Sequence, residues 1–191
     1  ARAMGCSDLA STAATTASAP QDVFALLQGF LKFPRKNDAD WLNSIVILSA
    51  FAFENYYGVP GLARSVITDD YYDVSQKAYD RTPFDPKDIT TDLTKLIRPE
   101  YFDPQFFAAS AYGRLMQQTQ AYRRVIQSPV RNYIGAADEA IPLGIGRMAE
   151  TYAMAMGTGN TNVEAVTTGE TDHRGTFATA VPQWKIWFDS K

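Results

Sequence analysis

The sequence has very few of the side chains on which several kinds of site depend. Its 191 residues include one cysteine, Cys6, and one histidine, His173. A single cysteine excludes an internal disulfide and a thiolate metal cluster. It also leaves the cellular compartment open, secretion and the periplasm included, because disulfides are what would mark an oxidising environment. No targeting segment is visible.

The sequence also lacks a large excess of one sign of charge and a long hydrophobic run. Lys and Arg total 18 against 21 Asp and Glu, which gives a net charge of −3. Nucleic-acid binding needs a basic excess, so we do not expect that partner. The longest apolar stretch, residues 45–53, is much shorter than the roughly 20 residues of a membrane-spanning helix. With 46% apolar residues, the composition is that of a folded globular chain.

Composition divides the chain into three zones. Residues 1–22 are small and rich in Ala, Thr and Ser, and residues 23–125 hold 18 of the 24 aromatic residues. Residues 126–191 alternate short β-like runs with helical patterns, which is typical of an α/β unit. We therefore expect an α/β fold, with parallel strands and crossover helices in the outer zones and a mainly helical insertion between them.

The first and third zones contain the expected strands. Residues 9–19 are small and β-branched without a polar face, which suits a strand buried on both sides. Residues 129–134 and 163–168 form two further strands. A helix over 142–156 connects them, and a last helix covers 176–188. A strand–helix–strand order of this kind predicts parallel strands.

The middle zone shows apolar spacing typical of helices, separated by proline-marked turns. Asp40 is placed to cap the second of these helices. Asp103 and Pro104 open the last one. The expected helices cover residues 23–33, 41–53, 71–79, 93–97 and 105–125.

Two side chains that can do acid–base chemistry follow the last two strands. Asp138 comes after the strand at 129–134, and His173 comes after the strand at 163–168. Ligands and catalytic groups of open α/β sheets lie beyond the carboxyl ends of the strands. An imidazole there can act as a general base, and a carboxylate can fix its tautomer and stabilise the imidazolium. Glu139 is a rival carboxylate, whereas Asp172 is adjacent to His173 and poorly placed to reach its far ring nitrogen.

These segments resemble the C-terminal part of an α/β-hydrolase. The string GAADEAIP matches the segment that carries the acid in that family, and TDHRGTF matches the one that carries the histidine. The order and the crossover between them also agree, and the middle zone falls where esterases and lipases of this fold insert a helical lid. The resemblance implies that Asp138 and His173 are two members of a catalytic triad, with no metal and no cofactor.

The third member of such a triad is missing from the sequence. No Gly-x-Ser-x-Gly nucleophile elbow occurs in it. The nearest string, around Cys6 and Ser7, lacks the second glycine and has no room for the helix that follows an elbow. We expect that an N-terminal portion, on a separate chain or absent from this sequence, carries the serine and the oxyanion hole.

The aromatic residues of the middle zone have two interpretations. They form the core of a helical domain, or they line an apolar pocket for the substrate; we expect both uses, with core packing as the larger share. The candidates for substrate contact are Phe51 and Phe53, at the end of the second expected helix, and Tyr56 and Tyr57 just after it. Residues 22–124 contain thirteen acidic and twelve basic side chains and so carry almost no net charge, which does not favour a strongly charged substrate.

The sequence thus predicts a serine hydrolase that acts on small carboxylic esters, like an esterase or a lipase. This chain supplies the acid, the histidine and the lid. Two alternatives stay open: a peptidase or thioesterase on the same fold, and a binding domain of this fold without catalysis.

Overall fold

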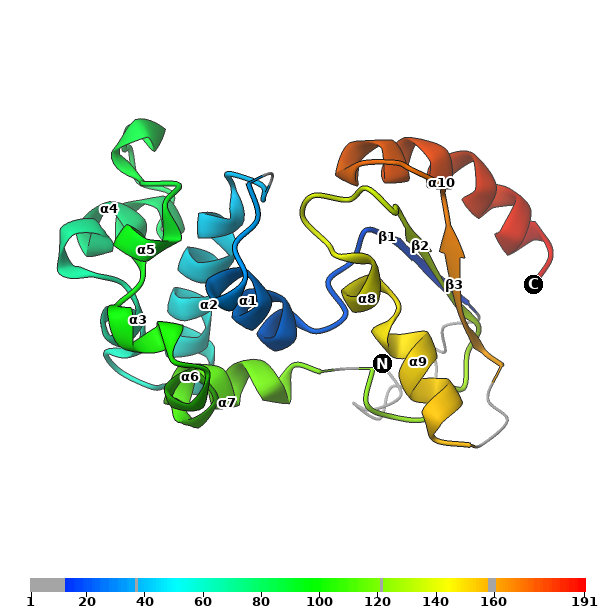
Figure 1. The fold of residues 1–191 in the computed structure, drawn as a ribbon, viewed down its shortest axis with the longest axis horizontal. Helices are drawn as coiled ribbons and strands as arrows, with labels where there is room; N and C mark the ends of the chain where they lie inside the picture. The colour runs from blue at the N-terminus through cyan, green and yellow to red at the C-terminus, as the bar shows by residue number, and fades with distance from the viewer. Residues whose placement is uncertain (1–12, 37, 121, 158–160) are drawn as a thin grey trace. The chain divides into compact units, whose positions relative to one another are not determined.

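A computed structural model describes residues 13–36, 38–120, 122–157 and 161–191 (Figure 1). The chain divides into two units. One is an α/β unit made of residues 1–22 and 120–191, and the other is a helical unit, Val23–Thr119. Composition suggests boundaries near residues 22 and 125, and the interpretation of the outer segments as a hydrolase core and of the middle segment as a lid stays a prediction.

The α/β unit contains a parallel sheet of three strands in the order β1-β2-β3. The register pairs Ala14 with Val130, and Val130 with Val163. The expectation of parallel strands is confirmed. The part of the expected first strand that precedes residue 13 lies outside the described residues. The strands are β1 (Ala14–Ala17), β2 (Val130–Ile134) and β3 (Val163–Thr167).

Helices cover both faces of this sheet (Figure 1). Val163 packs with α9, whereas Val166 packs with α10. Successive residues of a strand point to opposite faces, so the two helices lie on opposite sides of β3. The helices of this unit are α8 (Leu143–Gly146), α9 (Met148–Ala155) and α10 (His173–Asp189).

Two expectations about these helices were wrong. The helix expected over 142–156 is interrupted at Arg147, between α8 and α9. Gly146 lies directly against the side chain of Ile134, so α8 is held close to the end of β2. The last helix begins at His173 instead of residue 176, because the Asp172 carboxylate accepts the Gly175 N–H and caps it there.

A buried carboxylate joins the two chain segments at which the helical unit is inserted. Asp22 is 2% exposed and ends the first segment of the α/β unit. It accepts hydrogen bonds from the Gln120 amide at 2.6 Å and from the Tyr122 hydroxyl at 2.9 Å. These bonds hold the end of the first segment of the α/β unit to the beginning of its second segment.

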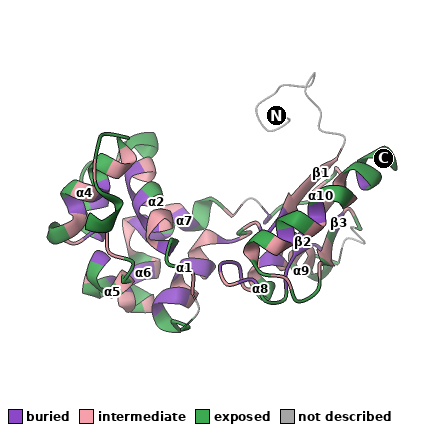
Figure 2. Cartoon of the chain, turned by 90° about the horizontal axis from the view of Figure 1, so that it is seen from above, coloured by how far each residue is buried: buried purple, intermediate pink, exposed green. Residues whose placement is uncertain are grey.

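The helical unit has a core of its own, built largely from aromatic rings. The Tyr112 ring contacts Tyr101 and Phe107, each with centroids 6.0 Å apart. Figure 2 shows that buried residues run through the helices of this unit. Its helices are α1 (Val23–Lys32), α2 (Leu42–Tyr57), α3 (Leu62–Val66), α4 (Asp69–Tyr79), η3 (Pro86–Asp88), α5 (Leu93–Leu96), η4 (Pro99–Phe102), α6 (Pro104–Ala109) and α7 (Ala111–Gln118).

Two details of the helical unit differ from expectation. The helix expected over 105–125 is divided at Ser110, whose extended backbone ends α6 and whose hydroxyl accepts the Gly113 N–H at 2.9 Å to begin α7. Asp40 does not cap α2, because the N-cap position is Trp41 and has no side-chain hydrogen bond.

Along the described residues, no helix combines the length and hydrophobicity needed to cross a membrane.

Candidate active site at the carboxyl ends of β2 and β3

Asp138 lies in the turn between β2 and α8 and is almost completely enclosed. Its side chain is 1% exposed. Oδ1 accepts hydrogen bonds from the backbone N–H groups of Ala140 at 2.9 Å and Ile141 at 2.8 Å. These bonds compensate the carboxylate for lost hydration and fix its orientation within the turn.

The loop after β3 is held against the start of this turn. Gly135 packs so closely on the loop that a Cβ there would overlap the Thr171 carbonyl oxygen and the Thr176 hydroxyl. The hydroxyls of Thr168, Thr171 and Thr176 form a chain of hydrogen bonds at 2.6 and 2.8 Å. The backbone N–H of Thr168 also donates to the Ile134 carbonyl at 2.9 Å. The loop therefore has little freedom to move relative to β2.

His173 is the first residue of α10, directly after this loop. Its Nδ1 lies 3.2 Å from each carboxylate oxygen of Asp138. The backbone N–H of His173 donates to Glu139 Oε2 at 3.0 Å. Thus the carboxylate of Asp138 faces the imidazole, whereas the adjacent carboxylate of Glu139 binds the backbone of the same residue.

The imidazole is partly accessible to solvent. The His173 side chain is 22% exposed. The Phe177 ring, one helical turn later, meets it edge to face with ring centroids 5.7 Å apart. An imidazole with a buried carboxylate at Nδ1 is suited to accept a proton at Nε2, because the carboxylate stabilises the resulting imidazolium.

The four aromatic residues expected to contact substrate do not gather on one face of α2. Phe51 is 4% exposed and belongs to the core of the helical unit, where it contacts Tyr72 and Tyr79. Phe53 contacts Tyr57; Phe53 is half-buried, whereas Tyr57 is exposed. Tyr56 is 85% exposed. Core packing therefore accounts for Phe51, and the substrate contacts of the four stay a prediction.

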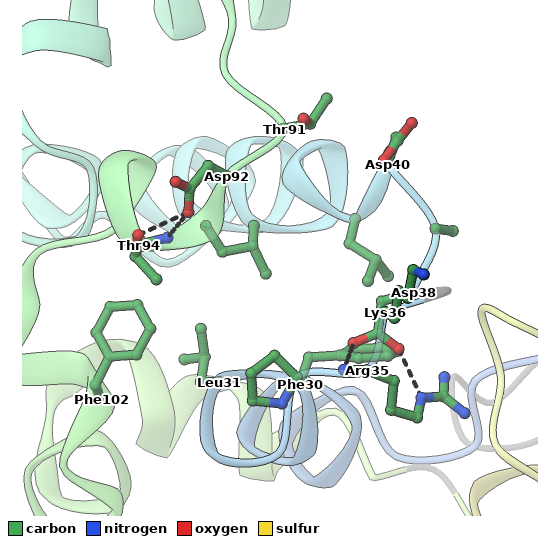
Figure 3. A pocket seen from close by; sticks show the side chains of 14 residues that line it. Phe30, Leu31, Arg35, Lys36, Asp38, Asp40, Thr91, Asp92, Thr94 and Phe102 are labelled. Atoms are coloured by element: carbon green, nitrogen blue, oxygen red, sulfur yellow. Dashed lines mark hydrogen bonds and ion pairs between the residues drawn. The ribbon is translucent and has the colours of Figure 1, made fainter.

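A pocket of about 260 Å³ opens elsewhere in the helical unit (Figure 3). Phe30, Leu31 and Phe102 lie along one side of it, and Asp92 and Thr94 lie on another. Its volume is slightly below the roughly 300 Å³ at which ligand pockets usually begin, so it suits only a small group. The four aromatic residues expected from the sequence do not line it.

Two candidates from the sequence lie outside the described residues. Cys6 and Ser7 belong to the segment 1–12, so the structure places neither of them. Among the residues that are described, no group of three His, Cys, Asp or Glu side chains could hold a metal ion.

Comparison with solved structures finds similar folds in proteins described as hydrolases or esterases. One similar structure is a protein described as a hydrolase from Legionella pneumophila, with a TM-score of 0.70 and 13% identity over 92% of this chain and 46% of that one. Another is the rice cell wall degrading esterase LipA from Xanthomonas oryzae, with a TM-score of 0.62 and 15% identity over 88% of this chain and 47% of that one.

At these identities the comparison establishes the fold alone. The chain spans about half the length of the solved structures it matches. The expected relation to part of an esterase-like hydrolase fold is confirmed at this level. No model of a known protein family matches the sequence. The curated proteins contain no match either.

Proposed function

We propose that this chain forms the acid and histidine half of the active site of a serine hydrolase that acts on carboxylic esters. The observation that carries the proposal is the position of His173 Nδ1, 3.2 Å from both oxygens of the buried Asp138 carboxylate. The two residues follow neighbouring parallel strands, at the edge of the sheet where catalytic groups of α/β proteins lie. The fold shared with a hydrolase and an esterase supports the same reaction class.

In this reaction His173 transfers protons and Asp138 orients it. The imidazole first takes the proton of the nucleophilic serine, which attacks the ester carbonyl, and then gives that proton to the leaving alkoxide. It next activates the water that hydrolyses the acyl-enzyme. Asp138 keeps the proton of the neutral ring on Nδ1 and stabilises the charged ring in both steps.

The nucleophilic serine belongs, in this proposal, to an N-terminal portion outside this sequence, which also supplies the oxyanion hole. The edge of β1 supports this arrangement. In the described part of the chain β1 has one strand partner, β2, so its other edge is available to strands of that portion. The helical unit takes the place of the lid, and uncharged esters are the favoured substrates.

A comparison of substrates tests the proposal on the complete protein, expressed with its N-terminal portion. We expect turnover of p-nitrophenyl esters and covalent labelling of one serine by a fluorophosphonate probe. Aminoacyl p-nitroanilides should react far more slowly, because an amide transfers its acyl group to the serine less readily than an ester does. Amide turnover equal to ester turnover would indicate a peptidase.

Two further outcomes would indicate a thioesterase or a binding domain instead. Turnover of acyl thioesters well above that of the matching oxygen esters would indicate a thioesterase. If the probe labels no serine and no ester is hydrolysed, the chain belongs to a binding domain, and the proposal is wrong.

A further inference from the structure

The two adjacent carboxylates of the β2–α8 turn contact two different groups of one residue. Asp138 faces the ring nitrogen Nδ1 of His173, and Glu139 accepts the backbone N–H of the same residue. One contact sets the direction of the imidazole, and the other fixes the backbone from which the imidazole projects. We infer that Glu139 is a positioning residue for His173, an inference that rests on the proposed function.

The place of His173 in α10 explains why its backbone needs an external partner. The first backbone N–H groups of a helix have no acceptor within the helix. Asp172 satisfies one of them, the N–H of Gly175, at 2.6 Å. It lies on the same loop as His173, however, so it cannot tie the helix to β2. Glu139 satisfies the N–H of His173 from the neighbouring turn and is half-buried there.

The bond to Glu139 therefore links the two segments whose separation determines the acid–base pair. Asp138 is fixed within its turn by the N–H groups of Ala140 and Ile141. If the start of α10 moved away from this turn, the ring nitrogen would leave its 3.2 Å position. A displacement of about 1 Å in an active site lowers rates by as much as a hundredfold. A negative charge at this end of a helix also interacts favourably with the helix dipole.

The test uses three variants of the complete protein. Glu139→Ala removes the acceptor, Glu139→Gln keeps an acceptor oxygen without the charge, and Asp172→Ala removes a cap of the same helix that does not reach β2. For Glu139→Ala we expect kcat for a p-nitrophenyl ester to fall about ten- to a hundredfold with KM unchanged. Glu139→Gln should retain kcat within about threefold of the parent, and Asp172→Ala should lower Tm while retaining kcat to the same extent.

A spectroscopic readout separates positioning from a merely structural role. The ¹⁵N shifts of the His173 imidazole, assigned by comparison with His173→Ala, report which ring nitrogen carries the proton. In the parent and in Glu139→Gln we expect the proton of the neutral ring on Nδ1. In Glu139→Ala we expect a mixture of tautomers, and faster hydrogen exchange at the His173 backbone amide.

The inference is overturned if Glu139→Ala leaves both kcat and the imidazole shifts unchanged, or if Asp172→Ala lowers kcat as much as Glu139→Ala does. It is also overturned if Glu139→Gln loses activity while Asp138→Asn keeps it, since Glu139 would then be the acid. Failure of the proposed function looks different. In that case the parent hydrolyses no ester, or His173→Ala keeps full esterase activity, while the imidazole shifts still report whether Glu139 positions the ring.

Discussion

His173 Nδ1 is equidistant, at 3.2 Å, from the two carboxylate oxygens of Asp138. One of these oxygens, Oδ1, also accepts two backbone N–H groups of its own turn. The carboxylate therefore stabilises its own turn through the backbone N–H groups, and it also interacts with the imidazole. Different substitutions of Asp138 can separate the two.

Asp138→Asn should abolish most activity and preserve the fold. The amide oxygen can still accept the N–H groups of Ala140 and Ile141, so the amide nitrogen is turned toward His173. Its N–H then favours the tautomer with the proton on Nε2, which cannot accept a proton from serine. We expect kcat for ester hydrolysis to fall about 10³- to 10⁴-fold, with Tm nearly unchanged.

Asp138→Ala is the comparison for this prediction. It leaves both backbone N–H groups without their acceptor and should also cost roughly 1–3 kcal/mol of unfolding free energy, measured by urea denaturation. Asp138→Asn with activity within tenfold of the parent would show that Asp138 is not the triad acid.

Gly135→Ala should destabilise the site, because Gly135 lies where the β2–α8 turn packs against the loop after β3. The new Cβ would overlap the Thr171 carbonyl oxygen and the Thr176 hydroxyl, so the loop before His173 must move. We expect a loss of about 1–3 kcal/mol of unfolding free energy and a lower kcat.

Gly144→Ala is the matched control for Gly135→Ala. Gly144 lies in α8, and a Cβ there has no neighbour within 4 Å. Alanine is the better helix former, so stability should change by at most about 1 kcal/mol, toward greater stability. Equal unfolding free energies for the two variants would contradict the close contact between Gly135 and the loop after β3.

Tyr112 makes the helical unit less stable as the pH becomes strongly alkaline. Burial raises the pKa of its hydroxyl above the ordinary value of 10.0, and the hydrogen bond with Ser49 at 2.6 Å opposes part of this effect. Between the pKa of the unfolded chain and the higher pKa of the folded protein, only the unfolded chain releases the proton. This contribution to stability is therefore complete below pH 10 and is lost as the pH rises further.

Urea denaturation at pH 9 and pH 11 measures this dependence. The unfolding free energy should fall more steeply over this interval in the parent than in Tyr112→Phe, which has no proton to release. An equal fall in both proteins would mean that Tyr112 does not control it.

The positions of Asp138 and His173 could be anticipated from the sequence, because the carboxyl ends of adjacent parallel strands meet at one edge of a sheet. Their catalytic role stays a prediction. The helix breaks at Ser110 and Arg147 could not be anticipated in this way. At Ser110 the hydroxyl caps the next helix through the Gly113 N–H, and just before Arg147 the residue Gly146 lies against Ile134 of β2, whereas the apolar spacing continues through both positions.

Other parts of the site were missed for different reasons. The sequence contained a signal for the start of α10, since Asp172 precedes Gly175 at the spacing of an N-cap. The contact of Glu139 with a backbone N–H gave no signal, because it depends on how two loops approach. Composition also cannot say which aromatic rings of α2 face the core, and Phe51 and Tyr56 differ completely in this respect.

The central claim is that His173, oriented by Asp138, performs the proton transfers of an ester hydrolase. The most direct measurement is kcat/KM for a p-nitrophenyl ester, compared between the complete protein and its His173→Ala variant at equal folded fraction. The account predicts a loss of at least about a thousandfold, because neither acylation nor deacylation then has a base. A loss of less than about tenfold would contradict it.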